Sequence, residues 1–304
     1  MTAQPPITRA GSIYDLGYRR YEGPRLGRVH AVRSLVAHSF RTTYGLGRGG
    51  RAKAAPLILG GLIVLPAVLT VGILAIAAQL GVGHQLDDAN LIGFDNYFSS
   101  VTAIIALFCA AQAPELFGRD QRHNVLALYF ARALRRSDYA LGRLVGFLLA
   151  VLLLLLLPML ILFLGRVLLS TDLARAFAEN LPSVPPVIAQ AAVIAGLYGG
   201  LAMAVSAFTP RRAYATAGIV ALFVLPGLVA RIVIGIGSSG VGTWLVLISP
   251  NTVIDGTNAL FFGRSLGEAF FFLDVPLWTF LISAVAGMVG ALLLILRRVA
   301  RIAP

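Results

Sequence analysis

The sequence predicts an all-α polytopic membrane protein with six transmembrane helices. Of its 304 residues, 58% are hydrophobic and only 12% are charged, and the mean hydropathy is +0.84, which is far more apolar than an ordinary soluble domain. The apolar residues also fall into long blocks. A bilayer core about 30 Å thick needs roughly 20 such residues in helical form. The composition and the blocks together favour a membrane protein over a soluble one.

A basic segment, residues 1–55, precedes the first apolar block. Within it, apolar residues recur at helical spacing from Val29 to Phe40, which predicts an interfacial amphipathic helix on the membrane surface. The glycine-rich stretch "GLGRGG" at 45–50 is expected to end that helix. A basic tail that only sets the topology explains the same charges equally well.

Six apolar blocks define a transmembrane domain at residues 56–297, followed by a tail at 298–304. The block at 98–113 is short for a span. The block at 214–236 contains Arg231, an ionised residue inside an apolar run. The predicted spans are 56–80, 98–113, 145–164, 187–208, 214–236 and 275–296.

The distribution of charge predicts the orientation, because short cytoplasmic loops retain Lys and Arg. With both termini in the cytoplasm, the cytoplasmic segments carry 21 of the 25 basic residues and the opposite side carries four. Eight acidic residues lie on that opposite side, among them Asp87 and Asp88. Topology therefore explains the net charge of +12 without a nucleic-acid partner.

The cytoplasmic link between the second and third spans has a basic amphiphilic pattern, "ALYFARALRRSDYALGRLVG". In a helix over residues 126–141, Leu126, Tyr129 and Phe130 share one face and the arginines lean away from it. Such a helix suits a docking surface for another protein. A basic anchor that contacts only lipid headgroups is the alternative.

Residues 237–274, between the fifth and sixth spans, contain apolar pieces such as "TWLVLISP" and "NALFFG". Each piece is too short to cross a membrane. We expect short re-entrant helices at the outer interface before the last span. A folded external loop packed on the span ends is the alternative.

The link resembles the coupling region of type 2 ABC exporter permeases, whose pattern reads roughly "E..EGTLELLLARPxSRxELLLGK". The stretch here is "DQRHNVLALYFARALRRSDYALGR", in which Asp120 takes the leading acidic position and Gly142 with Arg143 the closing pair. The opening "IYDLGYRRYEGPRLGR" and the six-span arrangement also resemble permeases of this type from actinobacteria. The departures are Asn124, Ala127 and Ala133, where the family has Gly, Glu and Pro.

The resemblance implies the permease subunit of an ATP-driven exporter in a bacterial plasma membrane. A P-loop needs a lysine after a glycine-rich turn, and the only lysine, Lys53, lies in "RAKAAP". ATP and Mg are therefore expected on a separate ATPase subunit, in two copies, with a second permease subunit, identical or related. The residues assigned to ATPase coupling are Asp120, Leu126, Tyr129, Phe130, Arg132, Arg135, Arg136 and Asp138.

The nature of the cargo is predicted from the spans, which hold no ionised residue apart from Arg231. This favours a hydrophobic or amphiphilic cargo, drug-like or lipid-like, over a small ion. Phe108, Phe223 and Leu225 are candidate pathway residues together with Arg231, although packing is the commoner role of such apolar side chains. Two roles are open for Arg231 near the end of its span: its side chain reaches the outer surface, or it caps a pathway between subunits. Its candidate partners are Glu268 and Asp274.

Other functions fit the same pattern. One is export of a cell-envelope glycolipid or polysaccharide by the same machinery, and another is a membrane anchor that recruits a cytosolic partner without transport. An intramembrane enzyme fits less well, because His30, His38, His84 and His123 lie outside the predicted spans. No paired carboxylates or metal-ligand spacing are visible either, so we expect no catalytic residue and no metal site.

Overall fold

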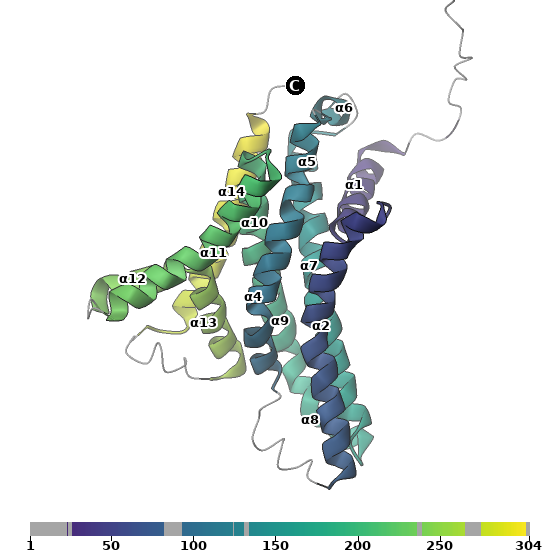
Figure 1. The fold of residues 1–304 in the computed structure, drawn as a ribbon, viewed down its shortest axis with the longest axis vertical. Helices are drawn as coiled ribbons and strands as arrows, with labels where there is room; N and C mark the ends of the chain where they lie inside the picture. The colour runs from purple at the N-terminus through teal and green to yellow at the C-terminus, as the bar shows by residue number, and fades with distance from the viewer. Residues whose placement is uncertain are drawn as a thin grey trace, which may run out of the picture.

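The fold is a bundle of helices (Figure 1). Every regular element in the described residues is a helix, and six helices are long and apolar enough to cross a membrane. This confirms the predicted all-α class and the multi-pass architecture. The computed structural model describes residues 23, 26–81, 93–123, 125–130, 134–235, 239–264 and 275–301.

The six long helices differ from the predicted spans mainly at their ends, because a helix continues past the apolar block until a cap or a breaker stops it. The short second span, 98–113, is lengthened in this way: it begins after Gly93 and continues beyond Gln112 into α5. The last span begins at Trp278, three residues later than predicted, just after Pro276. The long helices are α2 (Gly50–Gln79), α4 (Phe94–Gln112) with η1 (Ala113–Glu115) and α5 (Phe117–Arg122), α7 (Arg136–Leu168), the segmented helix Leu173–Phe208, α11 (Arg212–Gly235) and α14 (Trp278–Ala300).

The fourth long helix changes its hydrogen-bond pattern along its length. Its segments η2 and α9 begin among prolines, and η3 is a π-helix, in which each N–H bonds to the carbonyl five residues back. Tyr198 of η3 is fully buried and stacks on Phe223 of α11, with ring centroids 4.4 Å apart. The segments are α8 (Leu173–Asn180), η2 (Leu181–Ser183), α9 (Val184–Ile194), η3 (Ala195–Gly199) and α10 (Gly200–Phe208).

The long helices form a central and a peripheral layer. In the most apolar windows of α4 and of the fourth long helix, 61% and 72% of residues are buried, against 17–22% in α2, α11 and α14. Large apolar side chains cover the outer faces of the peripheral helices, as at Ile73 of α2 and Leu293 of α14. Exposed apolar faces of this extent are suited to lipid contact.

Helix α1 (Gly27–Thr43) occupies the position of the predicted amphipathic helix and packs along the first turns of α7. The approach is close because α7 presents Gly142 and Gly146. A Cβ on Gly142 would lie 2.8 Å from Leu35 Cδ2, and a Cβ on Gly146 would lie 2.6 Å from the Val36 carbonyl oxygen. Leu35 is accordingly buried, so part of the apolar face of α1 is covered by protein.

The break predicted at 45–50 is a tight turn that leads from α1 into α2. The Leu46 N–H donates to the Arg41 carbonyl at 2.9 Å, and the Gly45 N–H donates to the Thr42 carbonyl at 2.9 Å. These two bonds form a Schellman motif, which requires a left-handed residue. Gly45 supplies it at φ +68°.

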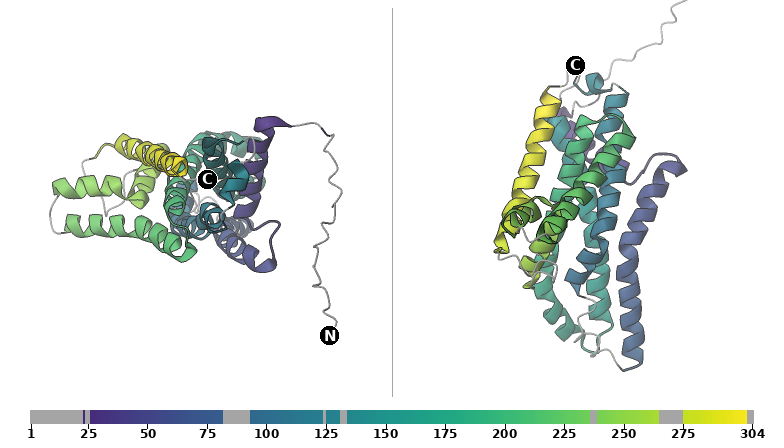
Figure 2. Two further views of the ribbon diagram at one scale, coloured as in Figure 1. Left: turned by 90° about the horizontal axis from the view of Figure 1, so that it is seen from above. Right: turned by 60° about the vertical axis from the view of Figure 1, so that its left-hand side comes forward.

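Two short helices lie in the described residues between the fifth and sixth long helices, α12 (Ser239–Ile248) and α13 (Pro250–Phe262). Helix α12 doubles back beside α11, and the pair extends away from the other helices (Figure 2). Asn258 of α13 donates to the Asp95 carbonyl at 3.1 Å, which connects α13 to the start of α4. The helical character of residues 239–262 agrees with the prediction for that part of 237–274, and residues 237–238 and 265–274 lie outside the described residues. The depth of these helices in a membrane stays a prediction.

Candidate functional site

The segment that joins α5 to α7 lies at one end of the bundle, here called the α6 end, beside the last turn of α14 (Figure 1). It contains the five-residue helix α6 (Leu126–Phe130). The predicted continuous helix over 126–141 is wrong: α6 ends at Phe130, and α7 begins at Arg136 after Arg135 in an extended conformation. The Arg135 N–H donates to Asp138 Oδ2 at 3.0 Å, which caps the new helix.

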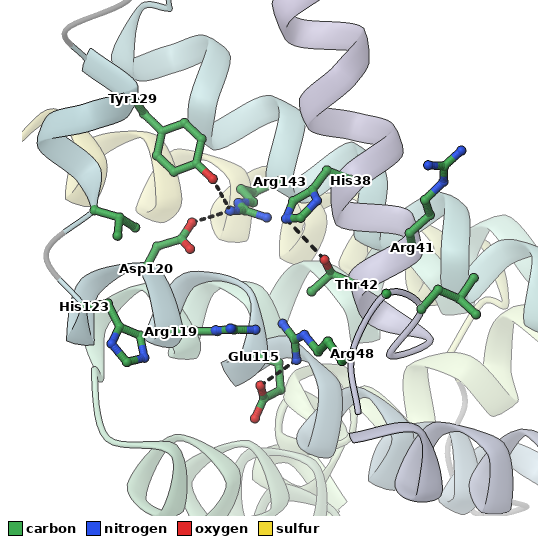
Figure 3. Close-up of a pocket in the computed structure, with 13 residues that line it drawn as sticks. His38, Arg41, Thr42, Arg48, Glu115, Arg119, Asp120, His123, Tyr129 and Arg143 are labelled. Carbon is green, nitrogen blue, oxygen red and sulfur yellow. Dashed lines mark hydrogen bonds and ion pairs between the residues drawn. The ribbon is translucent and has the colours of Figure 1, made fainter. Parts of the chain in front are cut away.

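A buried ion pair joins the two helices on either side of this link. Arg143 of α7 is 2% exposed and its Nη2 lies 2.5 Å from Asp120 Oδ2 of α5. The Tyr139 hydroxyl donates to the same carboxylate oxygen at 2.7 Å. Arg143 also donates to the Tyr129 hydroxyl at 3.1 Å (Figure 3) and to Ser39 Oγ at 3.3 Å. One guanidinium therefore connects α1, α5, α6 and α7.

Aromatic rings surround this ion pair. Tyr129 and Phe130 of α6 both contact the buried Tyr139 ring, with centroids 5.4 and 5.9 Å away, and Phe117 of α5 contacts it at 5.8 Å. The Arg143 guanidinium carbon lies 5.7 Å from the centroids of Tyr129 and Tyr139. Aromatic faces stabilise a cation that is removed from water. The network thus fixes α6 on the bundle.

Two further contacts hold the start of α7. The Arg28 guanidinium forms two parallel hydrogen bonds to Asp138, at 2.7 and 2.6 Å, the bidentate arrangement that gives arginine pairs their geometric specificity. Arg136 donates to the Ala300 carbonyl at the end of α14 at 2.7 Å. The first turn of α7 is therefore bound to α1 and to the last spanning helix.

The structure brings most of the predicted coupling residues together, but it turns several of them inward. Leu126 is buried, and Asp120 is the internal partner of Arg143. Tyr129 and Phe130 are partly buried against Tyr139. The apolar face predicted for docking is thus covered by the protein itself in this conformation.

The surface of the link is formed by other side chains. Leu128 is 69% exposed, and Arg135 is exposed as well. Arg132 lies outside the described residues. The sequence prediction did not identify Leu128 as a surface residue. It assumed one continuous helix over 126–141, whereas α6 ends at Phe130 and α7 begins at Arg136.

The predicted pathway residues do not come together. Phe108 and Phe223 are fully buried in the core, whereas Leu225 is 55% exposed and Arg231 is exposed. None of the four lines the cavity described below. The partners predicted for Arg231 at 268 and 274 lie outside the described residues. Among the described residues, the charge of Arg231 acts on Asp255 of α13: burial raises the pKa of Asp255 to about 6, and the charge of Arg231 opposes that rise.

A cavity of about 790 Å³ opens beside the ion pair, between α1, the turn after it, η1, α5, α6 and α7 (Figure 3). Glu115 on its wall pairs with Arg48 at 2.9 Å and with Arg212 at 2.9 Å. Partial burial lowers the pKa of His38, and the charge of Arg143 lowers it further. The lining residues are His38, Arg41, Thr42, Leu46, Gly47, Arg48, Glu115, Arg119, Asp120, His123, Val125, Tyr129 and Arg143.

Sequence reasoning missed the contacts that build this region. Arg28 and Asp138 are 110 residues apart, and Arg143 and Ser39 are 104 residues apart. Helical spacing relates residues three or four positions apart, so nothing in a single sequence links these partners. The one local signal was Gly142 and Gly146, whose spacing of four permits close helix packing.

Among the described residues, no group of three His, Cys, Asp or Glu side chains is placed to hold a metal ion. The chain matches no protein-family model, and no curated protein matches it. The fold and the geometry at the α6 end are therefore the basis for any functional conclusion.

Proposed function

We propose that this chain is the membrane-spanning permease subunit of an ATP-driven ABC exporter, with a separate ATPase docked at the α6 end. The observation that carries the proposal is the segment 120–143. Its sequence resembles the coupling region of type 2 ABC exporter permeases, and its helices are joined by the buried pair between Asp120 and Arg143. Leu128 on the same segment remains exposed and is available to a partner.

Such an arrangement suits the transmission of force. A transporter is driven only if the ATPase favours one permease conformation over another. Asp120 lies at the end of the second long helix and Arg143 at the start of the third, so a displacement of the link acts on both. The bond from Arg136 to Ala300 extends the connection to the sixth.

The proposed assembly contains two ATPase copies, which bind ATP and Mg, and a second permease subunit in the same bilayer. The proposed membrane is a bacterial plasma membrane with both chain ends in the cytoplasm, and the cargo is a hydrophobic or amphiphilic compound. A cell-envelope glycolipid or polysaccharide is the alternative cargo. A membrane anchor without transport would use the same docking surface, and a transport assay separates it from an exporter.

The test is co-purification from the native membrane. We expect a protein with a P-loop to accompany the tagged chain in mild detergent at a fixed ratio, measured by mass spectrometry. Leu128→Glu should release it, because a charge then enters an apolar contact. The matched control is Leu80→Glu, since Leu80 is 70% exposed at the end of α2 and lies at the opposite end of the bundle (Figure 1).

Two results would contradict the proposal. One is the repeated absence of such an ATPase while the permease remains intact. The other is equal retention of the ATPase by the Leu128→Glu and Leu80→Glu variants.

A further inference from the structure

The cavity at the α6 end carries more positive charge than its own carboxylates neutralise. Four arginines and two histidines line it, against two acidic residues. Arg48 pairs with Glu115, and Arg143 pairs with Asp120. Among the described residues, the guanidinium groups of Arg41 and Arg119 have no hydrogen-bond or ion-pair partner.

The charges of Arg119 and Arg48 lie close together, whereas Arg41 projects outward at the rim of the cavity. Figure 3 shows Arg119 extending across the cavity toward Arg48, and the charge of Arg119 contributes to the lowered pKa of Arg48, after burial. Arg143 Nε is buried without a hydrogen-bond partner among the described residues. Guanidinium groups held side by side form a ready site for an anion, because an anion relieves their repulsion and accepts their hydrogen bonds.

The position of the cavity in the chain points to the membrane surface. Arg143 stands two residues before the apolar block at 145–164, and Glu115 two residues after the block at 98–113. The cavity therefore lies where apolar spans give way to polar chain, the level of lipid headgroups. Exposed Leu46 and partly buried Val125 add apolar contacts to its wall.

We propose that this cavity binds a phosphate group, with Arg119 and Arg48 as its principal ligands and Arg41 at its rim, and that the phosphate is the headgroup of an anionic phospholipid. The volume lies within the range of about 300–1,000 Å³ typical of ligand sites and admits a headgroup larger than phosphate alone. Phosphate is favoured over a carboxylate because its oxygens engage several guanidinium groups at once. All the residues that line the cavity belong to this chain, so phosphate can bind there whether or not an ATPase docks at the α6 end.

The test uses the purified full-length chain in detergent, freed of native lipid. Three probes are added: phosphatidylglycerol, diacylglycerol with the same acyl chains, and inorganic phosphate. Bound lipid is counted by native mass spectrometry. We expect phosphatidylglycerol to bind and diacylglycerol not to bind. If inorganic phosphate binds tightly and phosphatidylglycerol does not bind, the site takes the free anion. If phosphatidylglycerol binds and added phosphate does not displace it, the site takes the lipid.

Variants localise the binding. Arg41→Gln with Arg119→Gln should weaken phosphatidylglycerol binding about tenfold or more, because two charged hydrogen-bond donors are lost. The matched control is Arg33→Gln with Arg51→Gln, which removes two exposed arginines from α1 and α2 that do not line the cavity. All four side chains are exposed, so the variants should fold.

A second measurement reports from inside the cavity. The charged groups that line the cavity with His38 are the arginines Arg41, Arg48, Arg119 and Arg143 and the carboxylates Glu115 and Asp120, and the His123 imidazole lines it as well. A bound phosphate should raise the pKa of His38 in an NMR titration, since an adjacent anion favours the imidazolium. The His38→Asn variant assigns the signal.

The proposal is overturned by any of four results. Three concern binding: no binding of phosphatidylglycerol or inorganic phosphate, equal binding of diacylglycerol, or equal losses of phosphatidylglycerol binding in the double arginine variant and its control. The fourth is an unchanged His38 pKa with phosphatidylglycerol bound, which would place the lipid outside this cavity.

Discussion

Arg143 is the residue on which the α6 end depends. Replacing it with glutamine leaves the buried Asp120 carboxylate without its cation, which costs about 3–5 kcal/mol for a buried pair broken on one side. We therefore expect Arg143→Gln to lower the thermal unfolding temperature in detergent markedly. The double variant Asp120→Asn with Arg143→Gln should recover much of the loss, because no uncompensated charge remains.

The control for this experiment is Arg175→Gln. Arg175 pairs with Glu179 on α8, but both side chains are largely exposed, so solvent already screens the pair. We expect almost no change in unfolding temperature. A double variant no more stable than Arg143→Gln would show that charge burial is not the reason for the loss.

At the scale of residues, the sequence indicated which residues of the α6 end are important but did not indicate which residues they contact. Asp120, Asp138 and Arg143 were singled out through the resemblance, and all three lie at the α6 end. Their roles differ from the docking role expected of the segment: Asp120 and Arg143 neutralise each other inside the protein, and Asp138 caps α7 and receives Arg28. Such partners are fixed by tertiary packing, which local spacing does not encode.

At the scale of elements, the packing of α1 on α7 depends on Gly146. An added Cβ would lie 2.6 Å from both Ser39 Cβ and the Val36 carbonyl oxygen, and backbone cannot yield as a flexible side chain can. Gly146→Ala should therefore push α1 away, at a cost of about 1–3 kcal/mol. The measurement is the rate of tryptic cleavage after Arg33 and Arg41, which should rise.

Gly72→Ala is the matched control, because nothing lies within 4 Å of a Cβ at Gly72 of α2. Its cleavage rate should equal that of the unaltered protein. Equal rates in Gly146→Ala and Gly72→Ala would contradict a close α1 contact.

The elements themselves were largely predictable. Long apolar blocks predict spanning helices because no other backbone form satisfies its hydrogen bonds in lipid, and the glycine break at 45–50 predicted the end of α1. The link at 126–141 was the failure. The helical periodicity of its sequence runs on past Phe130, where α6 ends. A new helix starts at Arg136 because the Asp138 carboxylate accepts a hydrogen bond from the Arg135 N–H and caps it.

For the molecule as a whole, the orientation in the membrane is the prediction that matters most. The α6 end carries the arginine clusters of α1, α5 and the start of α7, and positive loops stay in the cytoplasm. A reporter fused after Asp88 should behave as external, whereas one fused at the C-terminus should behave as cytoplasmic. A cytoplasmic signal from the fusion after Asp88 would reverse the orientation, and with it the placement of a cytosolic ATPase at the α6 end.

The π-helix η3 has a consequence for how this chain tolerates changes in length. A π-turn holds one residue more than the α-helical turn it replaces, and each residue of an α-helix turns it by about 100°. Deleting one residue within 195–199 would therefore let the backbone close into a regular α-helix with little change in the rotation of α10 about its axis. Buried Met203 and Ser206 would stay close to their present register, whereas a one-residue deletion within α10 itself would turn every later residue of that helix by about 100°.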